Sequence, residues 1–173
     1  GYIELLVSES LGPIAEEQRH ALTVSQRAAG KLEDMIEDLI MFSLASRGEM
    51  SMKLESVDIR RIVALLSKTS ARKAEDRGVR LEVIAPETIP FVQADGQKVS
   101  WVVTQLIDNG IKFTQSGGSV TIALEEVGNN LVQVIVRDTG IGIPPNRMKE
   151  IFEPFHQLDG SSTRHYGGTG LGL

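Results

Sequence analysis

Cysteine is absent from this chain of 173 residues, which excludes disulfide bonds, thiolate metal sites and a cysteine nucleophile. Long hydrophobic runs are also absent: none approaches the ~18–20 residues of a membrane span, and no signal peptide is visible. The net charge is −5 with no long basic run, which argues against a nucleic-acid-binding surface. We therefore expect a cytoplasmic segment without nucleic acid and without direct membrane contact, although a longer parent protein could be membrane-anchored.

The first 48 residues predict part of a helical hairpin. Residues 15–46 read as one long helix, residues 1–9 as the end of an earlier one, and Gly12-Pro13 as the break between them. Apolar or small residues recur at alternating steps of three and four, a heptad seam made by Leu22, Ser25, Ala29, Leu32, Ile36, Leu39 and Ser43. An exposed seam of this kind favours a dimeric four-helix bundle, and intramolecular packing is the alternative.

Residues 52–173 predict a second domain of mixed α/β type. Strands are expected at 52–57, 79–84, 91–94, 119–125 and 131–137. Asp58 can cap a helix that runs to about residue 76 and closes at Gly78, and Asp95 can cap a helix over 97–113. This order indicates an α+β fold, an α/β sandwich with helices on one face of a mixed sheet.

The helix over 97–113 carries two rows of residues. One is an apolar stripe expected to pack on the sheet, made by Val99, Val103, Leu106 and Gly110. The other lies roughly a third of a turn away and contains Gln105, Asn109 and Lys112. An amide oxygen is a hard ligand for magnesium, and a lysine can neutralise phosphate charge. This second row therefore suits a metal–phosphate group, with an ordinary polar helix face as the alternative.

Asp138 stands where an apolar strand ends and a glycine-rich turn begins. Its carboxylate can accept a hydrogen bond from the exocyclic amine of adenine, whereas guanine would present a carbonyl there. Leaving that acceptor buried and unpaired costs about 1–3 kcal/mol, enough to set base preference. Gly140 and Gly142 permit close approach of the backbone to a base, and Ile143 completes the motif.

Residues 151–173 hold two further motifs. Phe152 and Phe155 would anchor the start of a polar lid over residues 156–166. A glycine cluster follows that can turn backbone N–H groups toward phosphates, made by Gly168, Thr169, Gly170, Leu171 and Gly172. It is not a Walker loop, because no Gly-Lys-Ser/Thr follows it.

In this order, these motifs resemble the catalytic ATP-binding domain of sensor histidine kinases, the kinase branch of the Bergerat-fold ATPases. The resemblance implies binding of ATP or ADP and Mg²⁺, with Asn109 as the metal ligand and Asp138 as the adenine-reading residue. It further implies catalytic roles for Asn109, Lys112 and Arg164, where Arg164 matches the lid arginine that can approach the terminal phosphate. The first position of the helix motif is usually Asn in that family, whereas this chain has Gln105 there.

The same resemblance implies a phosphate-accepting histidine on the first bundle helix, in a His-Glu/Asp-x-Arg-x-Pro context. None of His20, His156 and His165 has that context. The opening residues resemble the segment just after the acceptor motif, and Leu173 stops inside the second glycine motif, so truncation at both ends is expected. A homodimer through the hairpin and a response regulator receiver domain are the implied protein partners.

The sequence leaves two other functions open. One is a Bergerat-fold switch module that holds ATP or ADP without phosphotransfer, and fold alone does not separate it from a kinase. The other is a different enzyme of the superfamily, such as a serine-directed anti-sigma kinase or a topoisomerase-type ATPase. The heptad helix and the Phe-Glu-Pro-Phe motif of residues 152–155 favour the sensor kinase.

Overall fold

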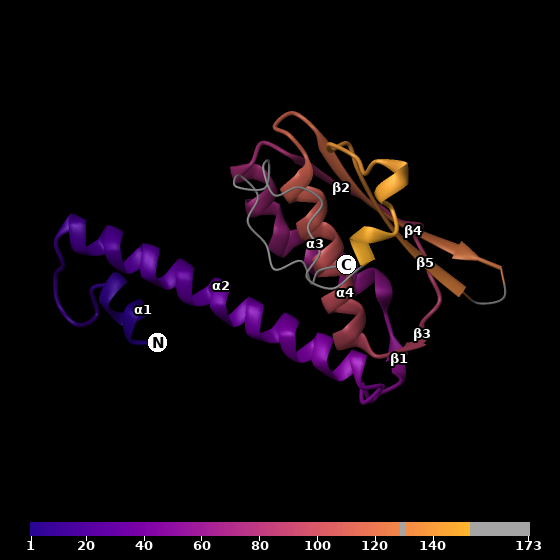
Figure 1. The fold of residues 1–173 in the computed structure, drawn as a ribbon, viewed down its shortest axis with the longest axis horizontal. Helices are drawn as coiled ribbons and strands as arrows, with labels where there is room; N and C mark the ends of the chain where they lie inside the picture. Colours follow the sequence, from indigo (N-terminus) through magenta and orange to yellow (C-terminus); the bar gives the residue numbers. More distant parts are fainter. Residues whose placement is uncertain (129–130, 153–173) are drawn as a thin grey trace. The chain divides into compact units, whose positions relative to one another are not determined.

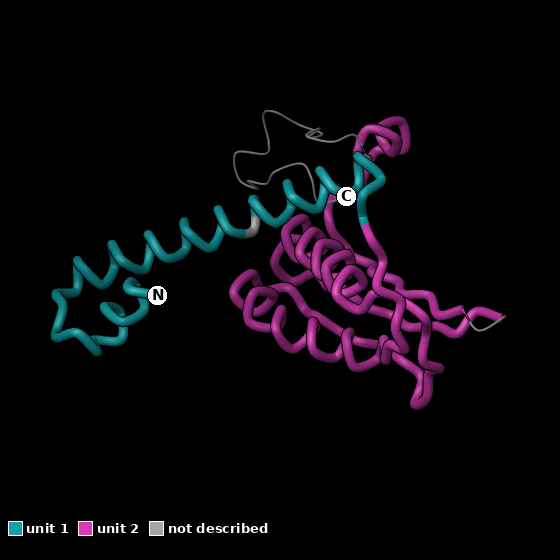
Figure 2. The backbone as a smooth tube through the Cα atoms, turned by 90° about the horizontal axis from the view of Figure 1, so that it is seen from below, with its two compact units in different colours: residues 1–50 teal, residues 51–173 magenta. Residues whose placement is uncertain are grey.

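The computed structural model describes residues 1–128 and 131–152, and the chain divides into two compact units, Gly1–Met50 and Ser51–Leu173 (Figure 2). The first unit consists of helices, and the second combines helices with strands. Across the described residues, no helix combines the length and the apolar character that a membrane crossing requires.

The first unit is a helical hairpin of α1 (Tyr2–Val7) and α2 (Glu16–Ser46). Arg19 of α2 joins the two helices, because its Nη1 donates to the carbonyl oxygen of Val7 at 2.8 Å and its Nη2 pairs with the Glu9 carboxylate. The first helix ends earlier than the Gly12-Pro13 break, at Val7, and Glu9 follows with a left-handed φ of 58°. The expected seam is exposed along α2: Leu32 is 58% and Leu39 is 50% accessible.

The second unit contains two sheets and two long helices (Figure 1). Along the chain its elements are β1 (Glu55–Val57), α3 (Ile59–Asp76), β2 (Arg80–Ile84), β3 (Val92–Ala94), α4 (Gly96–Phe113), β4 (Ser119–Val127), β5 (Leu131–Asp138), and the 3₁₀ turns η1 (Pro145–Arg147) and η2 (Glu150–Phe152). Strands β1 and β3 pair antiparallel, while β4 lies parallel to β2 and antiparallel to β5. The mixed sheet with α3 and α4 on one face confirms the expected fold class (Figure 1).

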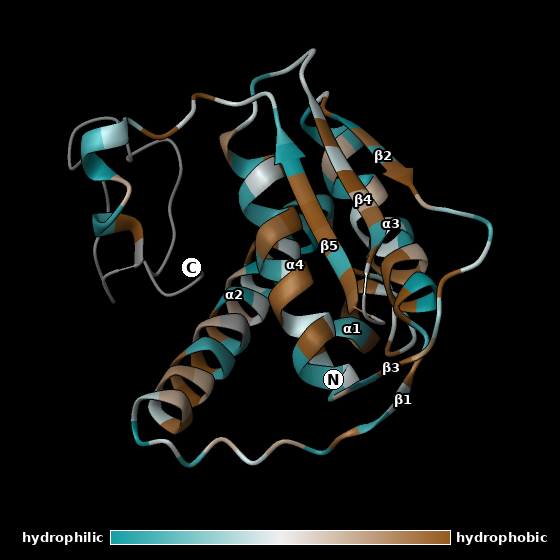
Figure 3. Ribbon diagram, turned by 90° about the vertical axis from the view of Figure 1, so that its right-hand side faces the viewer, coloured by the Kyte–Doolittle hydropathy of each residue, from teal (hydrophilic) through white to brown (hydrophobic). Residues whose placement is uncertain are grey.

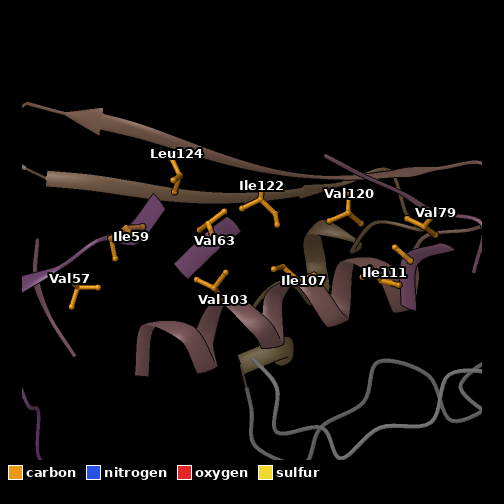
Figure 4. Close-up of a cluster of buried hydrophobic side chains, with 11 residues drawn as sticks. Val57, Ile59, Val63, Val79, Val103, Ile107, Ile111, Val120, Ile122 and Leu124 are labelled. Atoms are coloured by element: carbon orange, nitrogen blue, oxygen red, sulfur yellow. The ribbon is translucent and has the colours of Figure 1, made fainter. Parts of the chain in front are cut away.

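The core lies between the β2–β4–β5 sheet and the two helices. Alternate residues of β4 face the helices, and α4 contributes residues spaced four apart. Figure 4 shows the two facing rows: Val120, Ile122 and Leu124 against Val103, Ile107 and Ile111. Hydrophobic positions are accordingly concentrated on α4 and β5 (brown in Figure 3). Burying each such side chain contributes roughly 1.5–3 kcal/mol. Leu106 was expected in this stripe, but it is half-buried and Ile107 is fully buried instead.

Helix α3 ends in a Schellman motif that also sets the start of β2. Gly78 adopts a left-handed φ of 67°, its N–H donates to the Glu75 carbonyl at 2.8 Å, and the Val79 N–H donates to the Ala74 carbonyl at 2.9 Å. Because the Val79 N–H is used there, β2 begins at Arg80, one residue later than expected.

Asp95 caps α4 and also holds the segment that enters this unit. Its Oδ1 accepts from the Lys98 N–H at 3.2 Å, and its Oδ2 accepts from Lys98 Nζ at 2.5 Å and from the Lys53 N–H at 3.0 Å. Residue 53 therefore donates to a carboxylate rather than to a strand, which explains why β1 begins at Glu55 and not at residue 52.

We expect Asp95→Ser to lower the thermal unfolding midpoint more than Asp58→Ser does. Serine keeps the helix-capping acceptor at either position, but at 95 it loses the ion pair with Lys98 and the bond to Lys53. Asp58 is the matched control. Among the described residues, the one hydrogen bond of its side chain is accepted from the Arg61 N–H of α3 at 3.1 Å. Circular dichroism at pH 7 measures both midpoints, and equal losses would contradict this role of Asp95.

The Asp95 effect also has a pH dependence. The hydrogen bond from the Lys98 side chain, followed by the backbone N–H groups of Lys53 and Lys98, holds the pKa of Asp95 well below its usual range. A lowered pKa stabilises the fold above the unfolded-state value of about 3.9 and loses that contribution as pH falls. The difference between wild type and Asp95→Ser should therefore shrink below about pH 4.

Candidate functional site

The polar row of α4 is displaced from its expected place on the helix. Gln105, Asn109 and Lys112 share one face and are half-buried. At 100° per residue this face lies nearly opposite Ile107, rather than about a third of a turn from the buried stripe. The difference arises because Ile107, and not Leu106, is fully buried on the core-facing side of α4. The polar row on the opposite side therefore points away from the sheet. Two amides and an ammonium are thus aligned along the last three turns of α4.

Gly110 brings this part of α4 against the sheet. A Cβ at Gly110 would lie 3.1 and 3.2 Å from the two methyl carbons of Val120 and 3.8 Å from the Cβ of Asp138. A larger residue would push the helix away from both strands. The end of β5, with Asp138, is consequently held beside the last turns of α4 at Gly110.

The turn after β5 is hydrogen-bonded directly to the end of α4. The Ile141 N–H donates to the carbonyl oxygen of Phe113 at 3.2 Å. A Cβ at Gly140 would lie only 2.5 Å from that same oxygen, so the contact requires glycine at this position. Gly142 then adopts a left-handed φ of 69°. Two segments separated by about thirty residues are therefore in direct contact.

The Asp138 carboxylate is oriented by its own turn. Its Oδ1 accepts the Gly140 N–H at 2.9 Å, while Thr139 Oγ1 accepts the Ser119 N–H at 2.9 Å and fixes the end of β5 to β4. Within residues 1–128 and 131–152, Oδ2 has no hydrogen-bond partner and remains an exposed acceptor. Ile141 and Ile143 beside it are 64% and 42% exposed, so an acceptor and an apolar surface adjoin.

Lys112 lies in an unusually cationic environment. Burial, followed by the charges of Arg77 and Lys73, lowers the pKa of its ammonium. Its Nζ stands 4.6 Å from the centroid of the Phe113 ring, and Lys73 is itself paired with Asp108 at 2.7 Å. An anion bound near Lys112 would offset both the burial and the repulsion.

The described residues include Gln105, Asn109, Lys112, Asp138, Gly140, Gly142 and Ile143, and contacts at Gly110 and Phe113 join the turn of Asp138 to the end of α4. Phe155, Arg164 and the glycine cluster of residues 168–172 lie outside them. Sequence reasoning missed the Phe113 carbonyl, because a backbone bond to a distant turn leaves no pattern in the sequence. It also missed Arg77, although a cation directly before the helix-ending Gly78 is a recognised feature of helix C-termini.

Comparison with known proteins identifies the family to which these residues belong. The family described as histidine kinase-, DNA gyrase B-, and HSP90-like ATPase matches residues 94–173, which include α4 and the turn after β5. Hybrid signal transduction histidine kinase D of Dictyostelium discoideum is 37% identical over 159 residues, covering 90% of this chain and 10% of that protein. The chain spans only 10% to 33% of the length of such curated relatives.

Two solved structures show the same fold. Full-length ShkA in complex with AMPPNP has a TM-score of 0.77 at 24% identity, over 96% of this chain and 34% of that one. Histidine kinase ThkA in complex with the response regulator protein TrrA has a TM-score of 0.63 at 15% identity, over 90% of this chain and 47% of that one. The family match and the 37% identical relative, together with this fold, show that the chain belongs to the sensor histidine kinases and corresponds to their catalytic ATP-binding region.

Proposed function

We propose that this chain binds ATP with Mg²⁺ and donates the γ-phosphoryl group to a histidine for relay to a response regulator. The observation that carries the proposal is the bond between the Ile141 N–H and the Phe113 carbonyl, which joins the turn of Asp138 to the end of α4, the helix that carries Gln105, Asn109 and Lys112. A base reader and a phosphate-binding row on one surface fit a nucleotide better than separate ligands.

Asp138 would read the base. With Oδ1 occupied by the Gly140 N–H, Oδ2 is left to accept a hydrogen bond from the exocyclic amine of adenine. A bound base would cover this acceptor, so a guanine carbonyl in the same place would leave it unpaired at a cost of about 1–3 kcal/mol. The exposed side chains of Ile141 and Ile143 would contact the ring.

Asn109 and Lys112 would hold the phosphates, with Gln105 in support. Among the described residues no group of three His, Cys, Asp or Glu side chains could hold a metal ion. Asn109 would hold the magnesium ion through its amide oxygen, a hard ligand that suits this ion, and the ion would supply charge neutralisation at the phosphates. The ammonium of Lys112 would neutralise phosphate charge, which offsets the repulsion that it experiences from Arg77 and Lys73.

The remaining roles rest on residues outside the described part. We assign contacts with the lid and phosphates to Phe155, Arg164 and the cluster Gly168, Thr169, Gly170, Leu171 and Gly172. Phosphoryl transfer depends mainly on positioning and charge neutralisation, which these residues would complete. No structural observation specifically favours a switch module without transfer.

The hairpin unit would serve as the dimerisation domain. We place the acceptor histidine outside residues 1–173 and do not assign it to His20 of α2, which is followed by Ala21 rather than by an acid. The receiver domain of a response regulator would take the phosphoryl group from that acceptor. Because ATP is the donor, we place this reaction in the cytoplasm.

Asn109→Ala should weaken ATP binding at least about tenfold, or ~1.4 kcal/mol, when Mg²⁺ is present. The loss should be much smaller in a chelator, because only the metal-bridged contact is removed. Calorimetry in the two buffers gives both affinities. Equal weakening with and without Mg²⁺ would assign Asn109 to the fold or the base rather than to the metal.

Gly140→Ala should weaken binding of ATP and adenosine alike, by at least about tenfold. Its new Cβ cannot remain 2.5 Å from the Phe113 oxygen, so the turn that carries Asp138 must move. Gly128→Ala is the control, since a Cβ there meets nothing within 4 Å. Unchanged adenosine affinity in Gly140→Ala would show that the turn does not position the base reader.

Leu32→Glu should raise the dimer dissociation constant at least about tenfold, because it places a charge in the exposed seam of α2. Arg27→Gln is the control: it changes the net charge by the same unit on roughly the opposite side of the helix. Sedimentation over a range of concentrations measures both variants. Association that is unchanged by Leu32→Glu would exclude this seam as the dimer interface.

A further inference from the structure

The last turn of α4 is held from two sides. An α-helix leaves its final carbonyl groups without partners inside the helix. Here the Phe113 carbonyl accepts from Ile141, and the Lys112 carbonyl accepts from Nη1 of Arg77 at 3.0 Å. Arg77 comes from the end of α3, 35 residues earlier in the chain. Only the first of these two contacts belongs to the base-binding turn.

We propose that Arg77 is a positioning residue for Lys112, holding its backbone so that its ammonium meets the phosphates of the nucleotide. The inference rests on the proposed function, in which Lys112 binds phosphate. It gives Arg77, which lies outside every motif in the sequence, a role in affinity for the charged part of the ligand.

Arg77 is well placed to act as a rigid support. It is the last residue before Gly78, and the Schellman bonds of Gly78 and Val79 fix its backbone. Its guanidinium is planar and presents several N–H donors, so a bond to one carbonyl restricts both its position and its orientation. A cation at the C-terminus of α4 also interacts favourably with the helix dipole.

The charges around Lys112 act in the same direction. Lys73 is neutralised by Asp108 at 2.7 Å, whereas the bond that Arg77 makes is to a neutral carbonyl. The guanidinium therefore keeps its full positive charge close to the Lys112 ammonium. This repulsion disfavours an ammonium that lies against Arg77, and Nζ stands over the Phe113 ring at 4.6 Å from its centroid. Backbone support and charge repulsion thus both limit the positions open to the Lys112 ammonium.

The test compares ligands that differ only in phosphate, measured by calorimetry with Mg²⁺ on the intact protein. Arg77→Met should weaken ATP and ADP about three- to tenfold and leave adenosine within about twofold. Arg77→Lys should recover part of the loss, and Arg77→Gln keeps an N–H donor without the charge, so the two variants separate support from repulsion. Arg72→Met is the control: it removes the same charge from an exposed position on α3 that makes no side-chain interaction with the described residues.

A double-mutant cycle with Lys112→Met separates this proposal from the proposed function. If Arg77 acts through Lys112, Arg77→Met should cause no further loss of ATP affinity once Lys112 is replaced. If Lys112→Met weakens ATP while Arg77→Met does not, the role of Arg77 is wrong and that of Lys112 stands. If Lys112→Met leaves ATP affinity unchanged, both are wrong. An equal loss of adenosine and ATP affinity in Arg77→Met would show a general contribution to the fold and overturn the inference.

Discussion

The contact between the end of α4 and the end of β5 is the constraint on which the site depends. Gly110 permits it, because any side chain there would meet Val120 and Asp138. The bond from Ile141 to Phe113 then fixes the turn, and Gly140 leaves room for it. A segment at the end of a helix and a turn after a strand are thereby joined directly, and the proposed nucleotide site depends on that contact.

Charge at this surface is local and opposes the balance of the whole chain. The chain carries a net charge of −5, yet Lys112, Arg77 and Lys73 gather near the end of α4 with Asp108 as the nearby carboxylate. Burial and the like charges of Arg77 and Lys73 lower the pKa of Lys112. A bound anion would offset both effects, which is consistent with the proposed role of Lys112 in binding phosphate.

The two units differ in how far they bury their apolar side chains. The second unit buries Val103, Ile107 and Ile111 of α4 beneath its own sheet. In the hairpin, by contrast, α2 leaves Leu32 and Leu39 at least half exposed. A short α1 of six residues cannot cover a helix of 31 residues, so the apolar seam is free for a second molecule.

The sequence by itself determined the elements of this protein and the identity of its chemical groups. Helix caps at Asp58 and Asp95 and the helix end at Gly78 are local signals carried by neighbouring residues, and all of them appear in the structure. Only the tertiary structure decided the details that depend on distant partners. It shortened β1, since Lys53 bonds to Asp95 rather than to a strand, and it put Ile107 instead of Leu106 into the core. It also brought Arg77 to Lys112 and Ile141 to Phe113, because such bonds depend on how helices and strands pack and no local spacing encodes them.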